Sequence, residues 1–145
     1  DMPKKLGYLD LMHVASWQIS FKRESIVNNN VYFDEHMGAG SGNGAEEEFR
    51  FLTDCRKNGL AIYYVPFVIA DVAQTKSTWF KGYNEEFFIN RGNTTRYIMG
   101  YVPAVLYAAY YSIRKRHQFD SDISWFKAFR LIMKGIHENR LGKKK

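Results

Sequence analysis

The sequence predicts an α/β or α+β fold, in which a partial mixed sheet carries one flanking helix and two to three C-terminal helices follow. Three observations predict this class. Short runs rich in β-forming residues occupy the first half of the chain, and one of them is closed by Pro66. Between these runs, a segment with helical spacing follows a glycine-rich loop. The last third contains longer segments of helical periodicity, one of which has an apolar and a basic face.

Length and composition limit the protein class. A chain of 145 residues buries one modest core, so we expect a single domain or a piece of a larger protein. Hydrophobic content of 46% and charged content of 25% are typical of a globular protein. The aromatic fraction of 17% suits a sugar-facing surface or a membrane interface, and equally core or partner-facing area. The single cysteine, Cys55, excludes an internal disulfide, which favours the cytosol and a structural role for this thiol.

The first elements are expected in the following order. Leu11–Phe21 reads as a strand that ends at a basic pair, and Val31–Phe33 as a short strand or an extended lead-in. Ala45–Asn58 keeps apolar residues at helical spacing, and Gly59 supplies the usual stop signal. The next two strands are Leu60–Val65 and Phe67–Val72, which can lie in one sheet.

Helices are expected from Glu85 to the end of the chain. A helix beginning at Glu85–Asn90 should continue through Arg96 into the apolar stretch Tyr97–Ile113. Pro103 interrupts that stretch, so we expect a kink or two shorter helices there. Ile123–Arg140 is amphipathic, with residues from Trp125 and Phe126 to Ile136 on one face and basic residues largely on the other.

Short motifs between Ser16 and Gly100 occur in an order that is similar to one enzyme family. They are the basic strand end FKRE, the turn FDE at Phe33–Glu35, a glycine-rich loop running into Glu46–Glu48, and the strand GLAIYYVP. Together they resemble the C-terminal, acceptor-side half of family 2 glycosyltransferases, which are inverting enzymes with a GT-A-type fold. The resemblance implies that residues 1–96 are this acceptor-side half. Residues 97–145 are expected from their own pattern to form a helical segment, at a membrane interface or packed on protein.

The resemblance implies transfer of a sugar, of the hexosyltransferase type, from a nucleotide-diphosphate donor to a hydroxyl acceptor with inversion. Inverting transfer needs a general base that takes the proton of the attacking hydroxyl. In the family the acidic pair where the loop meets the helix carries the base. The match assigns the base to Glu47 and a neighbouring or acceptor-binding role to Glu46. A shift of one residue would exchange these roles within the triplet that ends at Glu48.

Five further residues are candidates for substrate binding. Gly42 and Gly44 have no side-chain bulk, so the backbone there can approach a ligand closely. Trp17 and Trp79 can stack on a sugar face, although either can instead belong to the core. Arg91 can approach the diphosphate or an anionic acceptor, and a solvated surface arginine is the plain alternative.

The departing diphosphate is expected to need a divalent cation, Mg or Mn, in the intact enzyme. In the family the metal-binding D-x-D belongs to the nucleotide-binding half, so most ligands are expected outside this chain and none is assigned within it. The literal match Asp120–Asp122 reads as a loop before a helix. Asp71 stands where many members have a histidine, and it is either an oxygen ligand or a plain strand-end residue. The chain begins with Asp1, which fits a fragment with the donor-site half missing, so we expect the chain alone to be inactive.

The C-terminal third predicts contact with a membrane surface or with another protein. The apolar, tyrosine-rich stretch Tyr97–Ile113 is followed at once by the basic run Arg114–His117, and the net charge of the chain is +6. Such segments suit an anionic bilayer, as in enzymes of cell-surface polysaccharide synthesis that act on a glycan or a lipid-linked acceptor. Packing on its own domain or in a homodimer is the alternative. The expected location is cytoplasmic, at the periphery of the inner membrane face.

A second hypothesis is a non-enzymatic, basic and aromatic-rich docking module for a membrane surface or a protein partner. It predicts that changing Glu46 and Glu47 leaves the function intact, whereas removing Ile123–Arg140 abolishes it. Nucleic acid is not an expected partner, because only the basic charge and the aromatic content favour it and no recognition signature is present.

Overall fold

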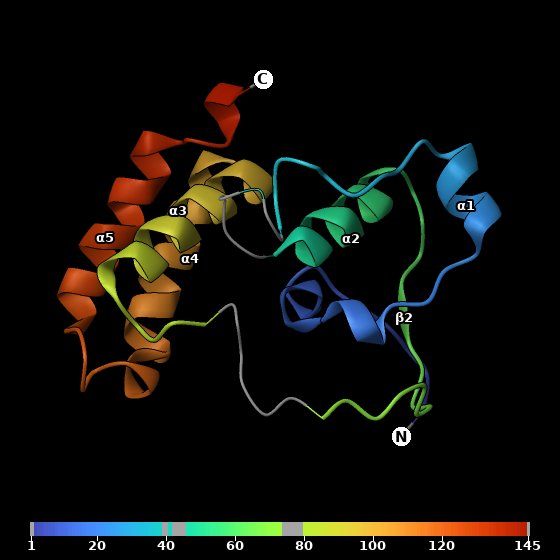
Figure 1. The fold of residues 1–145 in the computed structure, drawn as a ribbon, viewed down its shortest axis with the longest axis horizontal. Coiled ribbons are helices and arrows are strands. Elements are labelled where there is room, and N and C mark those ends of the chain that lie inside the picture. Colours follow the sequence, from blue (N-terminus) through green and yellow to red (C-terminus); the bar gives the residue numbers. More distant parts are fainter. Residues whose placement is uncertain (1, 39–40, 42–45, 74–79, 145) are drawn as a thin grey trace. The chain divides into compact units, whose positions relative to one another are not determined.

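A computed structural model describes residues 2–38, 41, 46–73 and 80–144 of the chain. The described residues are mostly helical, with one small antiparallel sheet of two strands, which fits the α+β class (Figure 1). Those up to residue 73 form one compact unit and those from residue 80 onward form a second.

The first unit contains one long helix, a short helix, two 3₁₀ turns and the sheet. Figure 1 shows the long helix, α2, in green and the short helix, α1, in blue. In chain order the elements are β1 (Lys4–Lys5), η1 (Asp10–His13), η2 (Ser16–Gln18), α1 (Arg23–Asn28), α2 (Glu47–Lys57) and β2 (Tyr63–Tyr64). The strands pair antiparallel, with Lys4 opposite Tyr64 and Lys5 opposite Tyr63.

The boundaries of α2 follow from its end residues. Gly59 adopts a φ of 80°, and its N–H donates to the carbonyl of Arg56 while the N–H of Leu60 donates to the carbonyl of Cys55. These two bonds are the Schellman arrangement, which ends a helix at a glycine. The helix predicted over Ala45–Asn58, with Gly59 as its stop, is therefore confirmed within the described residues.

The core of the first unit is built on α2. The helix buries Phe49, Phe51, Leu52, Thr53 and Cys55, and Leu11 of η1 is completely buried. The rings of Tyr8 and Phe49 meet edge to face, with centroids 5.6 Å apart. Aromatic pairs of this geometry add to the free energy gained by burial.

The strand predicted over Leu11–Phe21 is wrong, since this segment forms the turns η1 and η2. Local side chains satisfy the backbone there: the Asp10 carboxylate accepts from the N–H of Gly7, and the Gln18 amide oxygen accepts from the N–H of Ala15. Such bonds compete with a strand ladder. The sequence shows β-forming residues, but it does not show whether a partner strand is present.

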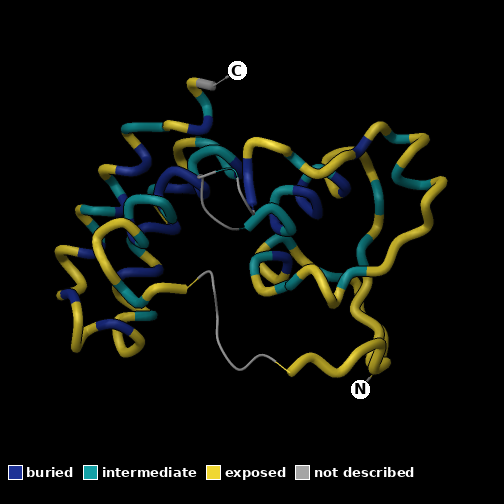
Figure 2. Tube along the Cα trace, viewed as in Figure 1, coloured by how far each residue is buried: buried dark blue, intermediate teal, exposed yellow. Residues whose placement is uncertain are grey.

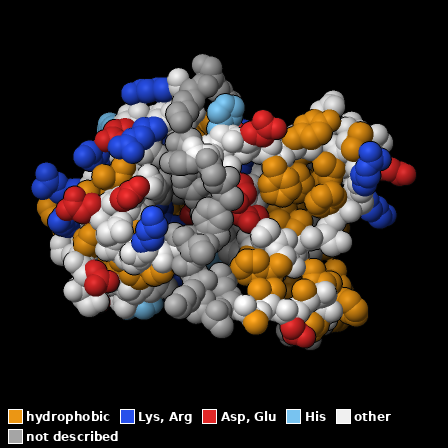
Figure 3. All heavy atoms as spheres, in the orientation of Figure 1, with side chains coloured by type: hydrophobic (Ala, Val, Ile, Leu, Met, Phe, Trp, Pro, Cys, Tyr) orange, Lys and Arg blue, Asp and Glu red, His pale blue; other side chains and the backbone are white. Residues whose placement is uncertain are grey.

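The strands predicted over Leu60–Val65 and Phe67–Val72 are also largely absent. Only Tyr63–Tyr64 pairs, with β1, and the later run has no regular structure. From residue 61 to residue 73 the chain is exposed almost throughout, as the yellow trace after α2 shows (Figure 2). Hydrophobic side chains also gather on the face of the first unit in view in Figure 3. Strands need neighbours to bury their apolar faces, and the described residues provide a pairing only two residues long.

The second unit contains three helices that pack on one another, α3 (Glu85–Met99), α4 (Tyr101–Arg114) and α5 (Trp125–Glu138). Two short 3₁₀ turns complete it, η3 (Arg116–Gln118) and η4 (Gly142–Lys144). Helix α3, which the sequence predicts to begin at Glu85–Asn90, packs on the other two helices and belongs to this second unit.

Helices α3 and α4 are separated at Gly100. The sequence instead predicts the break at Pro103. Gly100 has a φ of 87°, which ends α3 and redirects the chain. Pro103 lies in the first turn of α4, where its missing N–H removes no bond within the helix.

The predicted helix over Ile123–Arg140 is confirmed as α5, and its buried face is narrower than expected. Ser124 accepts a hydrogen bond from the N–H of Lys127 and so caps the start of the helix. The buried residues are Ala128, Ile132, Gly135 and Ile136. Trp125 and Phe126, which the sequence placed on that same face, are exposed in the first turn.

Helices α3 and α5 approach so closely that only glycine fits at two positions. A methyl group at Gly92 would overlap the carbonyl oxygen of Ile132, and one at Gly135 would overlap that of Ile89. Beside this crossing, Asn93 Oδ1 accepts from the N–H of Arg140 at 2.8 Å. Close packing here depends on the backbones of both helices.

None of the helices in the described parts of the chain has the length and apolar character that crossing a bilayer requires.

Cys55 is expected to react slowly with a thiol reagent in the folded protein. Its side chain is buried in α2, and burial raises the pKa of the thiol, so little thiolate is present at neutral pH. Labelling with Ellman's reagent should be at least about tenfold slower in buffer than in urea. Equal rates in both conditions would show that this part of the core is open.

Candidate functional site

The acidic triplet lies at the start of α2. Glu47 and Glu48 are in the first helical turn, where carboxylates interact favourably with the positive end of the helix dipole. Glu46 is the residue before the helix, and all three side chains are partly exposed. The helix therefore presents this row of carboxylates at the edge of the first unit's core.

Glu47 is held against the backbone of Gly38. A methyl group built at Gly38 would lie 2.7 Å from both Cδ and Oε1 of Glu47, so the carboxyl group occupies the space that any larger residue would need. Gly38 also has a φ of 85°, which favours glycine. The turn that follows the FDE motif and the start of α2 are thus in direct contact.

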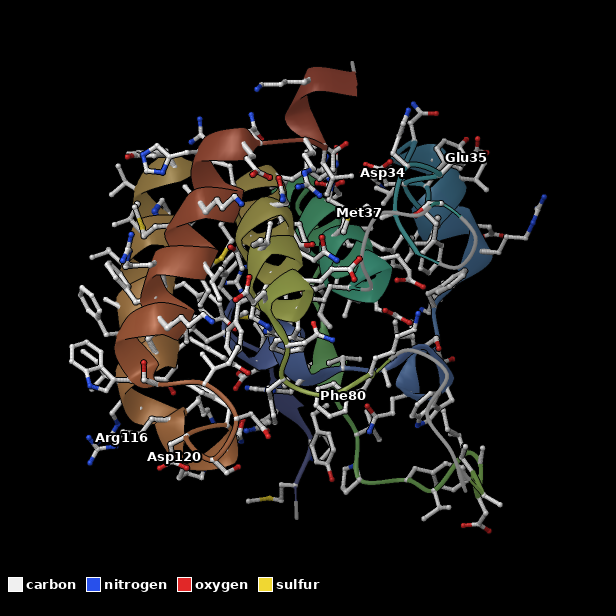
Figure 4. All side chains as sticks on the ribbon, turned by 60° about the vertical axis from the view of Figure 1, so that its left-hand side comes forward. Asp34, Glu35, Met37, Phe80, Arg116 and Asp120 are labelled. Atoms are coloured by element: carbon white, nitrogen blue, oxygen red, sulfur yellow. The ribbon has the colours of Figure 1, made fainter. Side chains whose placement is uncertain are left out.

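The FDE motif forms a turn stabilised by Asp34. Its carboxylate oxygen Oδ1 accepts from the N–H of His36 at 3.0 Å, and its carbonyl accepts from the N–H of Met37, also at 3.0 Å. This is the Asx-turn geometry that aspartate favours. Figure 4 shows the labelled Asp34 and Met37 close to each other on this segment. Met37 is buried, which fixes the position of Gly38 next to it.

An aromatic stack joins the other end of the turn to α2. The rings of Phe33 and Phe51 lie parallel, with centroids 4.2 Å apart and an interplanar angle of 2°. Phe21 packs on the same Phe51 ring at 5.7 Å. The FDE segment therefore contacts α2 at two places, through the stacked ring of Phe33 and through Gly38, which lies next to Glu47.

Glu46 adopts a backbone conformation that few residues with a side chain adopt. Its φ is 87° and its ψ is 23°, in the left-handed region, where the Cβ atom is crowded. One carboxylate oxygen, Oε2, is buried. A non-glycine residue keeps a left-handed conformation only where the surrounding structure holds it there, and such residues are often found at functional sites.

The structure places an imidazole next to a carboxylate, a contact that the sequence analysis did not predict. His36 Nδ1 lies 3.1 Å from Asp34 Oδ1, with the imidazole largely exposed. The two residues are two positions apart, so only the turn geometry could reveal the contact. Likewise, the sequence shows that Gly38 is a glycine but not that Glu47 packs on it.

Arg91 lies in the second unit, within α3, and its guanidinium is surrounded by aromatic side chains. It lies 4.8 Å from the ring centroid of Tyr111 and 5.1 Å from that of Phe87, and Nη1 donates to the Tyr107 hydroxyl at 2.7 Å. The cation–π contact with Tyr111 and the hydrogen bond to Tyr107 join α3 to α4, whereas the contact with Phe87 lies within α3. Its predicted contact with substrate stays a prediction.

The remaining predicted substrate-binding residues are only partly described. Trp17 lies in η2 with 47% of its surface exposed, so its ring is accessible to a ligand. Gly42, Gly44 and Trp79 lie outside the residues that the structure describes. For these four residues sugar binding stays a prediction.

A metal site is not formed by the described residues, among which no three histidine, cysteine, aspartate or glutamate side chains could together hold an ion. Asp120 and Asp122 lie in the turn before Ser124, as expected of a loop at a helix start, and Figure 4 labels Asp120 there. The divalent cation expected for the intact enzyme stays a prediction.

Comparison with known proteins found no matching family model, no matching curated protein and no matching solved structure.

Replacing Gly38 by alanine should disturb both the turn and Glu47. The left-handed φ alone costs about 1–2 kcal/mol for a residue with a Cβ atom. The methyl group would in addition displace the Glu47 carboxyl group. Gly59→Ala is the matched control, because Gly59 has a similar φ of 80° and nothing within 4 Å of an added methyl group. Urea unfolding should show a larger loss for Gly38→Ala, and equal losses would mean that the Glu47 contact contributes nothing.

Proposed function

We propose that this chain is the acceptor-side part of an inverting glycosyltransferase that uses a nucleotide-diphosphate sugar. The observation that carries the proposal is the contact between Glu47 and Gly38, which joins the FDE turn to the acidic start of α2. These are the two motifs whose order resembles family 2 enzymes, and a base at this junction must be held in a fixed place.

In the proposed reaction Glu47 acts as general base. Its carboxylate takes the proton of the acceptor hydroxyl while that oxygen forms a bond to the anomeric carbon. The bond from the anomeric carbon to the nucleoside diphosphate breaks from the opposite face, so the configuration inverts and the diphosphate leaves with the electron pair. Glu46, adjacent to Glu47 and fixed in its left-handed conformation, positions the acceptor.

We further propose that the exposed run after β2 completes a mixed GT-A-type sheet in the intact enzyme. Four apolar residues of this run are each more than half exposed: Val65, Phe67, Val68 and Ile69. A continuous apolar run of this kind is typical of a strand whose two faces are buried by neighbouring elements. The donor half would supply those neighbours, together with most ligands of the Mg or Mn ion. The acceptor is then a glycan or a lipid-linked sugar on the inner side of the membrane.

The proposal is tested by measuring release of nucleoside diphosphate from a panel of nucleotide sugars, with and without Mg or Mn. The protein to be tested is the one translated from the whole reading frame that contains these residues. This protein should release nucleoside diphosphate when acceptor is present. The 145-residue chain alone should show little or no transfer. Absence of turnover by the longer protein with every donor would overturn the proposal, as would full activity of the short chain.

A further inference from the structure

Helix α4 has apolar residues on two opposite faces. The face that packs within the second unit contains Ala104, Tyr107, Ala108, Tyr111 and Ser112, all buried. On the opposite face lie Val102, Leu106, Tyr110 and Ile113, which are 65%, 68%, 52% and 54% exposed. We call these four residues the α4 stripe. Their spacing of four, four and three places them along one side of a helix.

The α4 stripe differs from an ordinary surface helix face. A helix at the edge of a soluble domain normally turns charged or polar residues outward, and a helix that is apolar all round is normally covered on every side. Scattered apolar side chains need no explanation, but an unbroken row along about three turns of a helix indicates an interaction surface.

The α4 stripe ends at a cluster of basic residues, and the first acidic residue after it is Asp120, whose backbone N–H donates to the carbonyl of Arg116 at 2.8 Å. From Tyr101 to Phe119 the sequence contains no aspartate or glutamate, whereas Arg114, Lys115 and Arg116 end the helix and begin η3. Within the described part of the chain no ion pair engages any of these three residues. Figure 4 shows the labelled Arg116 at the outer edge of the loop that follows α4.

We propose that the α4 stripe docks on the surface of an anionic lipid bilayer, with α4 lying in the plane of the headgroups. An apolar row next to a basic cluster matches a surface that has acyl chains below and negative headgroups above. Tyr110 suits this boundary, because its ring is apolar and its hydroxyl can remain in the hydrated headgroup region. A second copy of the chain fits less well, since the same helix of that copy contains no carboxylate for the basic cluster.

Vesicle flotation with the 145-residue chain tests the proposal. The chain should bind vesicles of phosphatidylcholine that contain about one third phosphatidylglycerol, and it should bind pure phosphatidylcholine much more weakly. Reversing the three charges, Arg114→Glu with Lys115→Glu and Arg116→Glu, should lower the partition coefficient at least about a hundredfold, from roughly fivefold for each of the three basic residues near the surface.

Matched variants separate docking by α4 from attraction by net charge. Lys4→Glu with Lys5→Glu and Lys22→Glu makes the same charge change in the first unit, on exposed residues, and should have a much smaller effect. Leu106→Glu should reduce binding strongly, whereas Val68→Glu, at a residue 76% exposed in the first unit, should not. Equal losses in both members of either pair would overturn the proposal.

A labelled variant keeps the test valid if Leu106→Glu fails to fold. Leu106→Cys can carry an environment-sensitive dye, while the native Cys55 is buried and reacts slowly. Its emission should shift to the blue on addition of anionic vesicles, and that of a dye on Val68→Cys should not. A blue shift at Leu106→Cys that needs no vesicles and rises with protein concentration would instead identify a second copy as the occupant and overturn the proposal.

Discussion

Replacing Glu47 by glutamine is expected to lower the rate of sugar transfer by the intact enzyme about 10²–10⁴-fold, the usual contribution of a general base. Glutamine has nearly the same shape, so it can keep the packing against Gly38. Its amide cannot take the proton of the acceptor hydroxyl. The loss should therefore appear in kcat with little change in the thermal stability of the first unit.

The neighbouring glutamates provide the controls for this prediction. Glu48→Gln removes one negative charge from the same first helical turn, so any general effect of charge should be equal for Glu47 and Glu48. We expect a change of less than about tenfold for Glu48→Gln. A large loss at Glu48 and a small one at Glu47 would shift the base by one residue. No loss at Glu46, Glu47 or Glu48 would favour the docking-module hypothesis over the transferase.

Replacing Gly92 by alanine is expected to destabilise the second unit by about 3 kcal/mol, at the upper end of overpacking effects. In an unhindered helix the same substitution would stabilise by roughly 1 kcal/mol, so the sign of the change is itself informative. The added methyl group would meet the carbonyl oxygen of Ile132, and a backbone cannot move aside as a flexible side chain does. Thermal and urea unfolding of the chain measure the effect.

Gly135 and Lys134 test whether the helix crossing causes the loss. Gly135→Ala should destabilise by a similar amount, because its methyl group would meet the carbonyl oxygen of Ile89 from the other side of the same crossing. Lys134→Ala, on the exposed face of α5, should change the stability by less than about 0.5 kcal/mol. A stabilising effect of Gly92→Ala would show that α3 and α5 lie farther apart in solution.

The acidic candidate site could be predicted in part. Three glutamates after a glycine-rich loop indicate a helix start, and α2 does begin at Glu47. The contact between Glu47 and Gly38 could not be predicted, because the two residues are nine positions apart and meet only in the folded first unit. The turn around Asp34 and His36 also depends on local geometry that residue types alone do not specify.

The sequence by itself determined the helices α2 and α5, because helical periodicity and a stop signal such as Gly59 act within one segment. The tertiary structure alone decided which β-forming runs become strands, since a strand exists only where another segment offers its backbone groups. It also decided that Gly92 and Gly135 must be glycines. Their role depends on the distance between two helix backbones, and that distance is a property of packing rather than of either segment.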